Sequence, residues 1–377
     1  MKYTALMFRP LDLLYLRGNR LFGGAGDHSD ALMPPWPSVF TGAVLSRALA
    51  DAGRMQEAAE RRNGPSLVSE MFGAFSARLV ALADKNRRGR IFFPLPADLA
   101  VLAAGDTPES IALSTLPRDS FSGCSSSLHP DIPEYPVLRT RLKAKPARGY
   151  WITIEGLTAH MEGKTVEPVH LVRTSDLWNT DSRLGIAMDS ATRTVEEGRI
   201  YTSDTIALAD GIGFLCVFSH ERGDVPEGGL VRLGGDGRGA EIFGYPDAPV
   251  DLGRPQEGWS RFRMILATPC PSEYGWIPPH VKKEGDGIYL TLNGFRARLM
   301  SSAVNRYEVI SGWDMVENRP KDAARVIPGG SVYWFEVEQG DTSALEDIWK
   351  AGLIPADDEK FTNRRREGFG QVWFCKA

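Results

Sequence analysis

The sequence predicts an α+β protein with two domains, and three observations lead to that fold class. The chain has 377 residues, more than one ordinary core holds, which suits about two domains of ~150–200 residues each. Hydrophobic residues make up 42% of the chain and charged residues 24%, which is the composition of a folded globular protein. Apolar runs of strand length outnumber the segments with helical periodicity, so strands and a few helices should share each core.

The first half of the chain predicts several strands, including residues 90–104 and 150–154, and a helix that packs on a sheet. Residues 2–9 form the first expected strand, and residues 213–220 form a buried one. Between them, an apolar stripe at helical spacing predicts a helix over 39–52, with Ser38 as its N-cap. Residues 105–136 are rich in Ser and Pro and predict a long excursion over the surface.

A polar stretch at 221–229 marks the expected domain boundary, because it contains Pro226 and paired glycines. The N-terminal domain then covers residues 1–222, and the C-terminal domain covers residues 223–377.

The second half predicts the order β-(α)-β-β-α-β, which is the ferredoxin-like arrangement. A strand over 261–268 comes first, followed by a hairpin whose strands cover 323–327 and 332–337. A helix then opens with a Ser-x-x-Glu capping box at Ser343, and the last strand covers 370–374. The first half can be read in the same order. We therefore expect two ferredoxin-like domains with long loop and hairpin insertions.

Charge and cysteine content limit the classes of function. The formal net charge is −4, whereas domains that hold nucleic acid unaided are usually basic. A local basic groove with acidic surface left for partners fits this charge better. The four cysteines lie far apart without a CxxC pair, so we expect neither a disulfide framework nor a metal site, and no cofactor. Without a signal peptide or an apolar run of membrane length, a cytoplasmic protein with no membrane contact is expected.

Four cations at a period of two form the first basic cluster: Arg139, Arg141, Lys143 and Lys145. On a strand, all four side chains would face one side. They would repel one another unless an anion lay over them. The cluster therefore indicates either a strip that tracks phosphates or a solvated strand that protects a sheet edge.

A second basic cluster lies near the C-terminus, where Arg364, Arg365 and Arg366 precede Gly368, Phe369 and Gly370. Glycines beside an aromatic residue let a nucleic-acid strand approach the backbone, and the ring offers a face on which a base stacks. The alternative is a solvated turn before the last strand, with Phe369 packed inside.

Several stretches of this sequence resemble one known family. They are Pro10-Leu11-Asp12-Leu13-Leu14-Tyr15-Leu16-Arg17, Phe22-Gly23, Pro34-Pro35-Trp36-Pro37-Ser38, Leu184 to Tyr201, Leu233 to Arg238, Val326 to Tyr333 and Gly368-Phe369-Gly370. Together and in this order, they are similar to the RAMP superfamily of CRISPR proteins, and within it to the third subunit of the Cmr (type III-B) effector. Residues 55–90 and 270–320 carry no recognised feature.

The resemblance implies two RRM-like (ferredoxin-like) domains and no nuclease activity in this subunit. It implies pairing with the large palm-domain subunit of the Cmr complex, contact with other RAMP subunits, and binding of the 5′ tag of the guide RNA. Residues 185–201 would form a hairpin that projects near the 5′ end of the guide. Its Thr192, Arg193 and Thr194 are suitable donors to phosphates and bases.

The leading hypothesis is therefore a non-catalytic, guide-RNA-binding scaffold subunit used in antiviral defence. Its predicted RNA-binding residues line one basic groove: Arg17, Arg139, Arg141, Lys143, Lys145, Thr192, Arg193, Thr194, Arg238, Arg364, Arg365, Arg366, Gly368, Phe369 and Gly370.

Two other hypotheses stay open. A metal-independent endonuclease acting on CRISPR repeat RNA would use His28, in a glycine-rich loop, as its general base. A nucleotide-binding enzyme would be built around Gly234–Gly239, which loosely matches a dinucleotide fingerprint. That fingerprint must open a helix, and Gly244 and Pro246 interrupt the stretch where the helix would lie.

Overall fold

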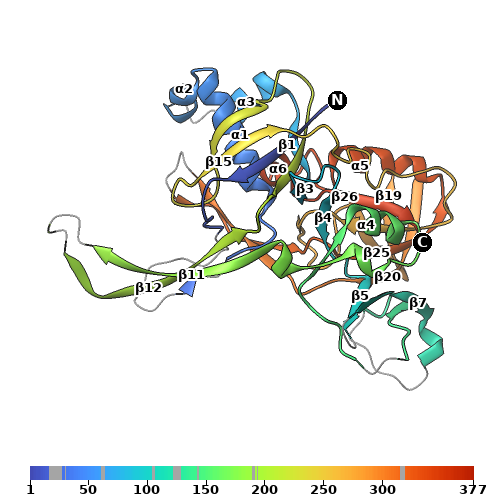
Figure 1. The fold of residues 1–377 in the computed structure, drawn as a ribbon. Coiled ribbons are helices and arrows are strands. Elements are labelled where there is room, and N and C mark those ends of the chain that lie inside the picture. Colours follow the sequence, from blue (N-terminus) through green and yellow to red (C-terminus); the bar gives the residue numbers. More distant parts are fainter. Residues whose placement is uncertain are drawn as a thin grey trace.

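The chain folds into two large antiparallel sheets with helices packed on them, which confirms the α+β class (Figure 1). The computed structural model describes residues 1–16, 28–29, 31–60, 64–103, 107–121, 129–141, 144–188, 192, 194–314 and 319–377.

Eight strands form the first sheet, and the strands predicted at 2–9 and 213–220 lie near its centre. β13 (Ile212–His220) pairs with β1 (Lys2–Pro10) on one side and with β3 (Phe75–Asp84) on the other. Every residue of β13 is buried, as expected of a strand that is covered on both faces. The order across the sheet is β10 (Leu171–Arg173), β9 (Tyr150–Thr153), β4 (Ile91–Pro94), β3, β13, β1, β15 (Gly239–Gly244) and β14 (Gly228–Arg232).

The predicted first helix is confirmed and packs on one face of this sheet. α1 (Pro37–Asp51) buries Phe40 against Phe8 of β1, with ring centroids 5.1 Å apart. The helix begins one residue before the expected cap, Ser38. Pro37 suits the first turn, because its ring fixes φ and the missing N–H would have no intrahelical partner there.

Six strands form the second sheet. β16 (Arg261–Leu266) lies between β25 (Val332–Gln339) and β26 (Val372–Lys376). The predicted helix before the last strand is present as α5 (Glu346–Ala351). The predicted cap at Ser343 is not observed: Asp341 caps the 3-10 turn Thr342–Leu345 that precedes α5, and α5 itself has no side-chain cap. The order across the sheet is β18 (Val281–Glu284), β19 (Gly287–Leu292), β20 (Phe295–Ala303), β25, β16 and β26.

The two sheets pack against each other through a shared apolar layer. Because side chains alternate along a strand, Leu215 and Val217 of β13 point away from α1. They join Val332, Trp334 and Trp373 of the second sheet in one buried cluster. One sheet therefore covers a face of the other.

The expected domain boundary at 222/223 falls inside the first sheet and needs correction. β14 and β15 both follow residue 223, yet β15 pairs with β1 and β14 pairs with β15. The change from the first sheet to the second falls between Gly244 and Arg261. The polar stretch at 221–229 is a turn between two strands of one sheet, because polar turns occur within domains as well as between them.

The strand order agrees with the ferredoxin-like prediction only in part. Four neighbouring strands of the first sheet lie side by side in the order β15, β1, β13, β3, and four of the second in the order β26, β16, β25, β20. Numbered by their order along the chain, both sets read 4-1-3-2, which is the order of a ferredoxin-like sheet. No helix lies between β13 and β15, where all residues are described, and β14 is found there instead. Likewise, β17 (Cys270–Pro271), β18 and β19 replace a helix between β16 and β20. Each sheet therefore carries one of the two expected crossover helices.

The predicted hairpin of 323–327 and 332–337 is wrong. β24 (Ala324–Ile327) pairs with β17 and with β21 (Glu308–Ile310), whereas β25 pairs with β20 and β16. One partner of β25, the strand β20, comes from residues 270–320, for which the sequence suggested no element. The two apolar runs are adjacent in sequence but belong to different sheets.

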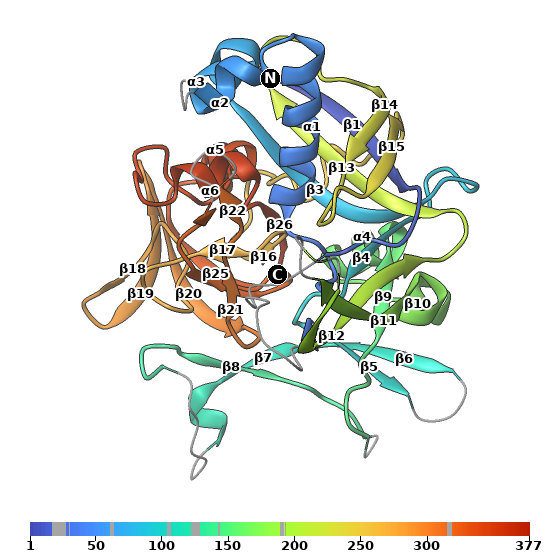
Figure 2. The same ribbon diagram turned by 90° about the vertical axis from the view of Figure 1, so that its left-hand side faces the viewer.

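The expected surface excursion, together with residues just before it, forms two small antiparallel pairs, which Figure 2 shows at one end of the molecule. They are β5 (Leu99–Ala103) with β6 (Pro108–Ala112) and β7 (Ser114–Pro117) with β8 (Glu134–Val137). The remaining elements are α2 (Met55–Glu60), α3 (Gly64–Phe72), α4 (Ile154–Met161), α6 (Thr362–Glu367), β22 (Trp313–Asp314), β23 (Arg319–Pro320), and 3-10 turns at Arg118–Phe121, Pro168–His170, Thr174–Asp176 and Thr342–Leu345.

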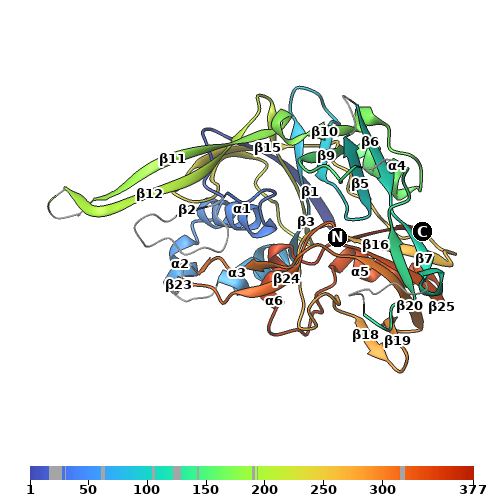
Figure 3. The ribbon, with the colours of Figure 1, turned by 90° about the horizontal axis from the view of Figure 1, so that it is seen from below.

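A long hairpin projects from the body of the protein (Figures 1 and 3). β11 (Trp178–Met188) and β12 (Val195–Leu208) pair along their length. The short β2 (His28–Ser29) runs parallel to β12, and Leu14 bridges to Ile206 near the root. The hairpin expected at 185–201 is thus confirmed, and it is longer than predicted.

Candidate nucleic-acid interface

The structure describes two of the three polar residues that were predicted at the end of the projecting hairpin. Thr192 and Thr194 are exposed, with their hydroxyl oxygens 2.8 Å apart; Arg193 lies outside the described residues. Two apolar side chains on β11 also face solvent, since Leu184 is 71% exposed and Ile186 46%. Large apolar side chains held away from any core are typical of a surface that a partner covers.

The first basic cluster does not form the predicted strand. Arg139, Arg141 and Lys145 are exposed, as expected, but they lie in irregular chain between β8 and β9; Lys143 lies outside the described residues. Their side chains are therefore not held on one face of a strand. An irregular path lets like charges point apart, which relieves the repulsion that a strand would impose.

The second basic cluster is partly inside the protein. Arg364 in α6 is only 7% exposed; its guanidinium donates to Glu367 at 3.0 Å and lies over the ring of Phe369 at 5.7 Å. Phe369 is fully buried in the core of the second sheet. The predicted stacking face on Phe369 is therefore not available in this structure, and the alternative of a packed ring is the one observed.

The two glycines of this cluster serve close packing. Gly368 has φ +97° and ends α6, and a Cβ built on it would lie 2.6 Å from the carbonyl oxygen of Ala77 in β3. A Cβ on Gly370 would lie 3.1 Å from Ile354. Of the predicted residues in this segment, Arg366 is exposed and Arg365 is half-buried, so these two remain accessible to a ligand.

The glycine-rich stretch 234–239 is the turn of the β14–β15 hairpin. No helix follows it, because β15 begins at Gly239; the nucleotide-binding hypothesis therefore lacks the helix N-terminus that it requires. The N–H of Gly235 donates to the carbonyl of Tyr15 at 2.8 Å. Arg238 lies over the Tyr15 ring at 5.1 Å and pairs with Asp12 at 2.6 Å, so its charge is partly engaged.

Two predicted residues are not placed by the structure. Arg17 lies outside the described residues. The backbone of His28 belongs to β2, beside the hairpin, but its side chain is outside what the structure describes. The endonuclease hypothesis built on His28 therefore stays a hypothesis.

The predicted residues that the structure describes come from several parts of the fold. They lie at the end of the hairpin, in the irregular chain before β9, in the β14–β15 turn and at the joint between the two sheets. Across the described ranges, no group of three or more metal-ligating side chains comes together. No described helix is long and apolar enough to cross a bilayer.

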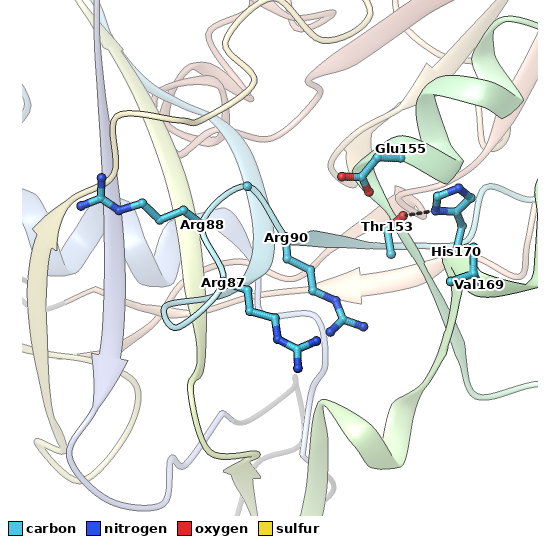
Figure 4. Close-up of a pocket in the computed structure, with 8 residues that line it drawn as sticks. Arg87, Arg88, Arg90, Thr153, Glu155, Val169 and His170 are labelled. Atoms are coloured by element: carbon cyan, nitrogen blue, oxygen red, sulfur yellow. Dashed lines mark hydrogen bonds between the residues drawn. The ribbon is translucent and has the colours of Figure 1, made fainter.

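Sequence reasoning missed a cationic turn between β3 and β4. Lys85, Arg87, Arg88 and Arg90 fall within six residues, and the turn borders a hollow of about 460 Å³ (Figure 4). The signal was present in the sequence as a run of cations around a glycine. It lay inside residues 55–90, where no element had been predicted.

Comparison with known structures places the fold among subunits of CRISPR effectors. A chain of a structure titled "Cryo-EM structure of the Type III-B Cmr-beta bound to cognate target RNA" matches with a TM-score of 0.52 and 15% identity, covering 98% of this chain and 96% of that one. A chain of the same complex bound to cognate target RNA and AMPPnP matches with a TM-score of 0.50 and 15% identity, covering 98% of both. At this identity the likeness concerns the fold alone.

The family follows from the sequence itself. The model of the family described as "CRISPR-associated protein (Cas_Cmr3)" matches residues 6–376. The chain belongs to this family and is a Cmr-type (type III-B) CRISPR protein of antiviral defence, which confirms the resemblance described above. No curated protein matches the sequence significantly.

Proposed function

We propose that this chain is a non-catalytic scaffold subunit of a type III-B effector and that it binds the 5′ tag of the guide RNA. The observation that carries the proposal is the long β11–β12 hairpin in a member of the Cas_Cmr3 family. A structural neighbour is described as bound to cognate target RNA, so an RNA-bound complex is the natural setting for this fold.

The surface of the hairpin supports contact with a strand of RNA and with a protein partner. Hydroxyl groups at its end, on Thr192 and Thr194, can donate to phosphates and to base edges. Exposed Leu184 and Ile186 offer apolar contact area along β11. We propose that the partners are the large palm-domain subunit and neighbouring RAMP subunits.

The net charge of −4 is consistent with a subunit that shares RNA binding with others. An acidic chain has little long-range attraction for RNA, since phosphate contacts supply most of that affinity. Local cations can still order a strand that the whole complex holds. In this proposal, Arg139, Arg141, Lys145, Arg365 and Arg366 are accessible candidates for such contacts.

A shortened hairpin tests the proposal. Leu184 and Thr202 are paired across the hairpin, so replacing residues 185–201 with Asn-Gly should close a two-residue turn. We expect the variant to keep its melting temperature and still to co-purify with the large subunit, but the complex should lose RNA with a uniform 5′ end. Unchanged recovery of that RNA would contradict the role of the hairpin.

A further inference from the structure

The turn between β3 and β4 is fixed in place by bonds to other parts of the first sheet. The N–H of Lys85 donates to the carbonyl of Gly211 at 2.9 Å. The N–H of Gly89 donates to the hydroxyl of Tyr245 at 3.0 Å, and Gly89 has φ +79°. These hydrogen bonds fix the backbone of the turn, from which the side chains of Arg87, Arg88 and Arg90 extend.

Two of these cations point to the same side. In Figure 4, the guanidinium groups of Arg87 and Arg90 lie close together, whereas Arg88 points the opposite way. Arg87 and Arg90 line both the hollow of about 460 Å³ and an adjoining one of about 400 Å³. Among the described residues, no ion pair joins either guanidinium to a carboxylate. Two neighbouring positive charges that form no direct ion pair leave their N–H donors open to an anion, although carboxylates lie nearby in both hollows.

The second hollow lies at the root of the projecting hairpin. Asp176 and Leu177 line it just before β11, and Asp210 and Ile212 line it just after β12. A strand of RNA that follows the hairpin toward the body of the protein would meet Arg87 and Arg90 there.

We propose that Arg87 and Arg90 clamp one phosphate of the bound RNA strand at the root of the β11–β12 hairpin. This inference rests on the proposed RNA-binding function and adds a site to it. A guanidinium is planar and presents paired N–H donors, which match two oxygens of a phosphate. Thr153 and His170, whose Oγ1 and Nδ1 atoms are 3.0 Å apart, complete the rim of the first hollow.

The surrounding carboxylates favour a phosphate inside a chain over a free one. Glu155 lines the first hollow, and Asp84, Asp176 and Asp210 line the second. A phosphodiester carries one negative charge, whereas a terminal phosphate carries close to two at neutral pH. Nearby carboxylates repel the doubly charged group more strongly, so the backbone of a polymer is the better ligand.

The test measures binding of single-stranded RNA to the full chain across a range of salt concentrations. We expect Arg87→Gln/Arg90→Gln to weaken binding roughly tenfold and to reduce the slope of log K against log salt by about 0.7, the value for one phosphate contact. Arg306→Gln is the matched control, because Arg306 is exposed and lines neither hollow; it should leave the slope unchanged. Arg87→Lys/Arg90→Lys should keep the slope and lose part of the affinity.

The outcomes separate this inference from the proposed function. If the wild-type chain, alone and within the assembled complex, holds no RNA, the proposed function fails and the clamp with it. If RNA is held and the double Gln variant behaves like Arg306→Gln, only the clamp is overturned. If the double Gln variant loses binding of inorganic phosphate or AMP but keeps its RNA binding, the site takes a free phosphate, and the clamp is overturned as well. The guanidinium of Arg90 also lies over the Phe92 ring at 5.4 Å, so replacing Arg90 removes a packing contact. If the double variant has a lower melting temperature than wild type, Arg87→Gln alone is the variant to test.

Discussion

Gly368 lies directly against Ala77, so the C-terminal turn is part of the joint between the two sheets. The carbonyl of Glu367, beside this glycine, accepts from the Thr41 hydroxyl of α1 at 3.0 Å. The carbonyl of Arg365 accepts from the Ser76 hydroxyl of β3 at 3.1 Å. The carbonyl groups at the end of α6 thus accept from residues of α1 and β3, and a side chain at position 368 would separate them.

Replacing this glycine should destabilise the protein strongly. Gly368→Ala adds a Cβ that would lie 2.6 Å from the Ala77 carbonyl oxygen, at φ +97°. Backbone strain and overpacking together should cost about 2–5 kcal/mol, measured by chemical denaturation. The control is Gly275→Ala, at φ +68° with nothing within 4 Å, which should cost about 1 kcal/mol. Equal losses in the two variants would contradict the packing argument.

A buried ionic group ties the first part of the chain to the second sheet. Asp98, between β4 and β5, accepts from His160 of α4 at 2.8 Å and from Arg263 of β16 at 2.7 Å. All three side chains are buried. Asp98→Asn leaves the Arg263 charge without its partner, which should lower the free energy of unfolding by about 3–5 kcal/mol.

The same carboxylate predicts a dependence on pH. Burial by itself raises the pKa of Asp98, but the hydrogen bond from His160 and the charge of Arg263 outweigh it, so the pKa lies below its ordinary value. Because the folded-state pKa is lowered, the stabilisation is complete above the unfolded pKa of about 3.9 and is lost as pH falls through the folded pKa. The difference between wild type and Asp98→Asn should therefore shrink only below about pH 4; a difference that stays constant down to pH 2 would count against this account.

The arginines of α6 should differ in their effects on stability. Arg364→Ala removes a buried group that pairs with Glu367 and covers Phe369, so unfolding should become easier by about 2–3 kcal/mol. Arg366 is exposed, and Arg366→Ala should change stability by less than about 0.5 kcal/mol. Thermal melting of the two variants decides this. Similar melting temperatures would mean that Arg364 is not the packed residue described here.

The apolar side chains of β11 should matter for assembly rather than for folding. Leu184→Ser/Ile186→Ser changes residues that face solvent, so the melting temperature should stay within about 2 °C of wild type. Retention of RNA and of the neighbouring RAMP subunits should fall, whereas co-purification with the large subunit should be unchanged. Leu230→Ser is the matched control, since Leu230 is 60% exposed on the edge strand β14. If both variants assemble equally well, the hairpin is not a contact surface.

Local features of the fold could be predicted from the sequence alone. The stripe that includes Phe40 predicted α1, the apolar run at 213–220 predicted β13, and the family pattern predicted a hairpin at 185–201. Each depends on neighbours in sequence, through helical spacing, uninterrupted burial or a motif. Their end points shifted by a few residues, because the ends of helices and strands depend on local hydrogen bonds that several nearby residues could supply.

The pairing of strands that lie far apart in the sequence could not be predicted in the same way. The partner of β25 is β20, more than 25 residues earlier, although β24 lies next to it in sequence. The Arg364–Gly370 segment could be read as a basic surface for RNA or as a turn with a packed ring, and only the structure shows that Phe369 is buried in the second core. Arg87 and Arg90 were neighbours in sequence, but nothing in the order of residues indicated that the root of the hairpin lies beside them.

By itself, the sequence determined the family, the α+β class, the hairpin and the positions of most central strands, because these follow from motifs and from the period of apolar residues. Only the tertiary structure decided which arginines are free and which are buried, and where one sheet ends and the next begins. Periodicity tells which face of an element is apolar, but it does not tell which distant element covers that face. Arg364 and Arg366 carry the same charge two residues apart, and only packing separates a structural residue from one that a ligand can reach.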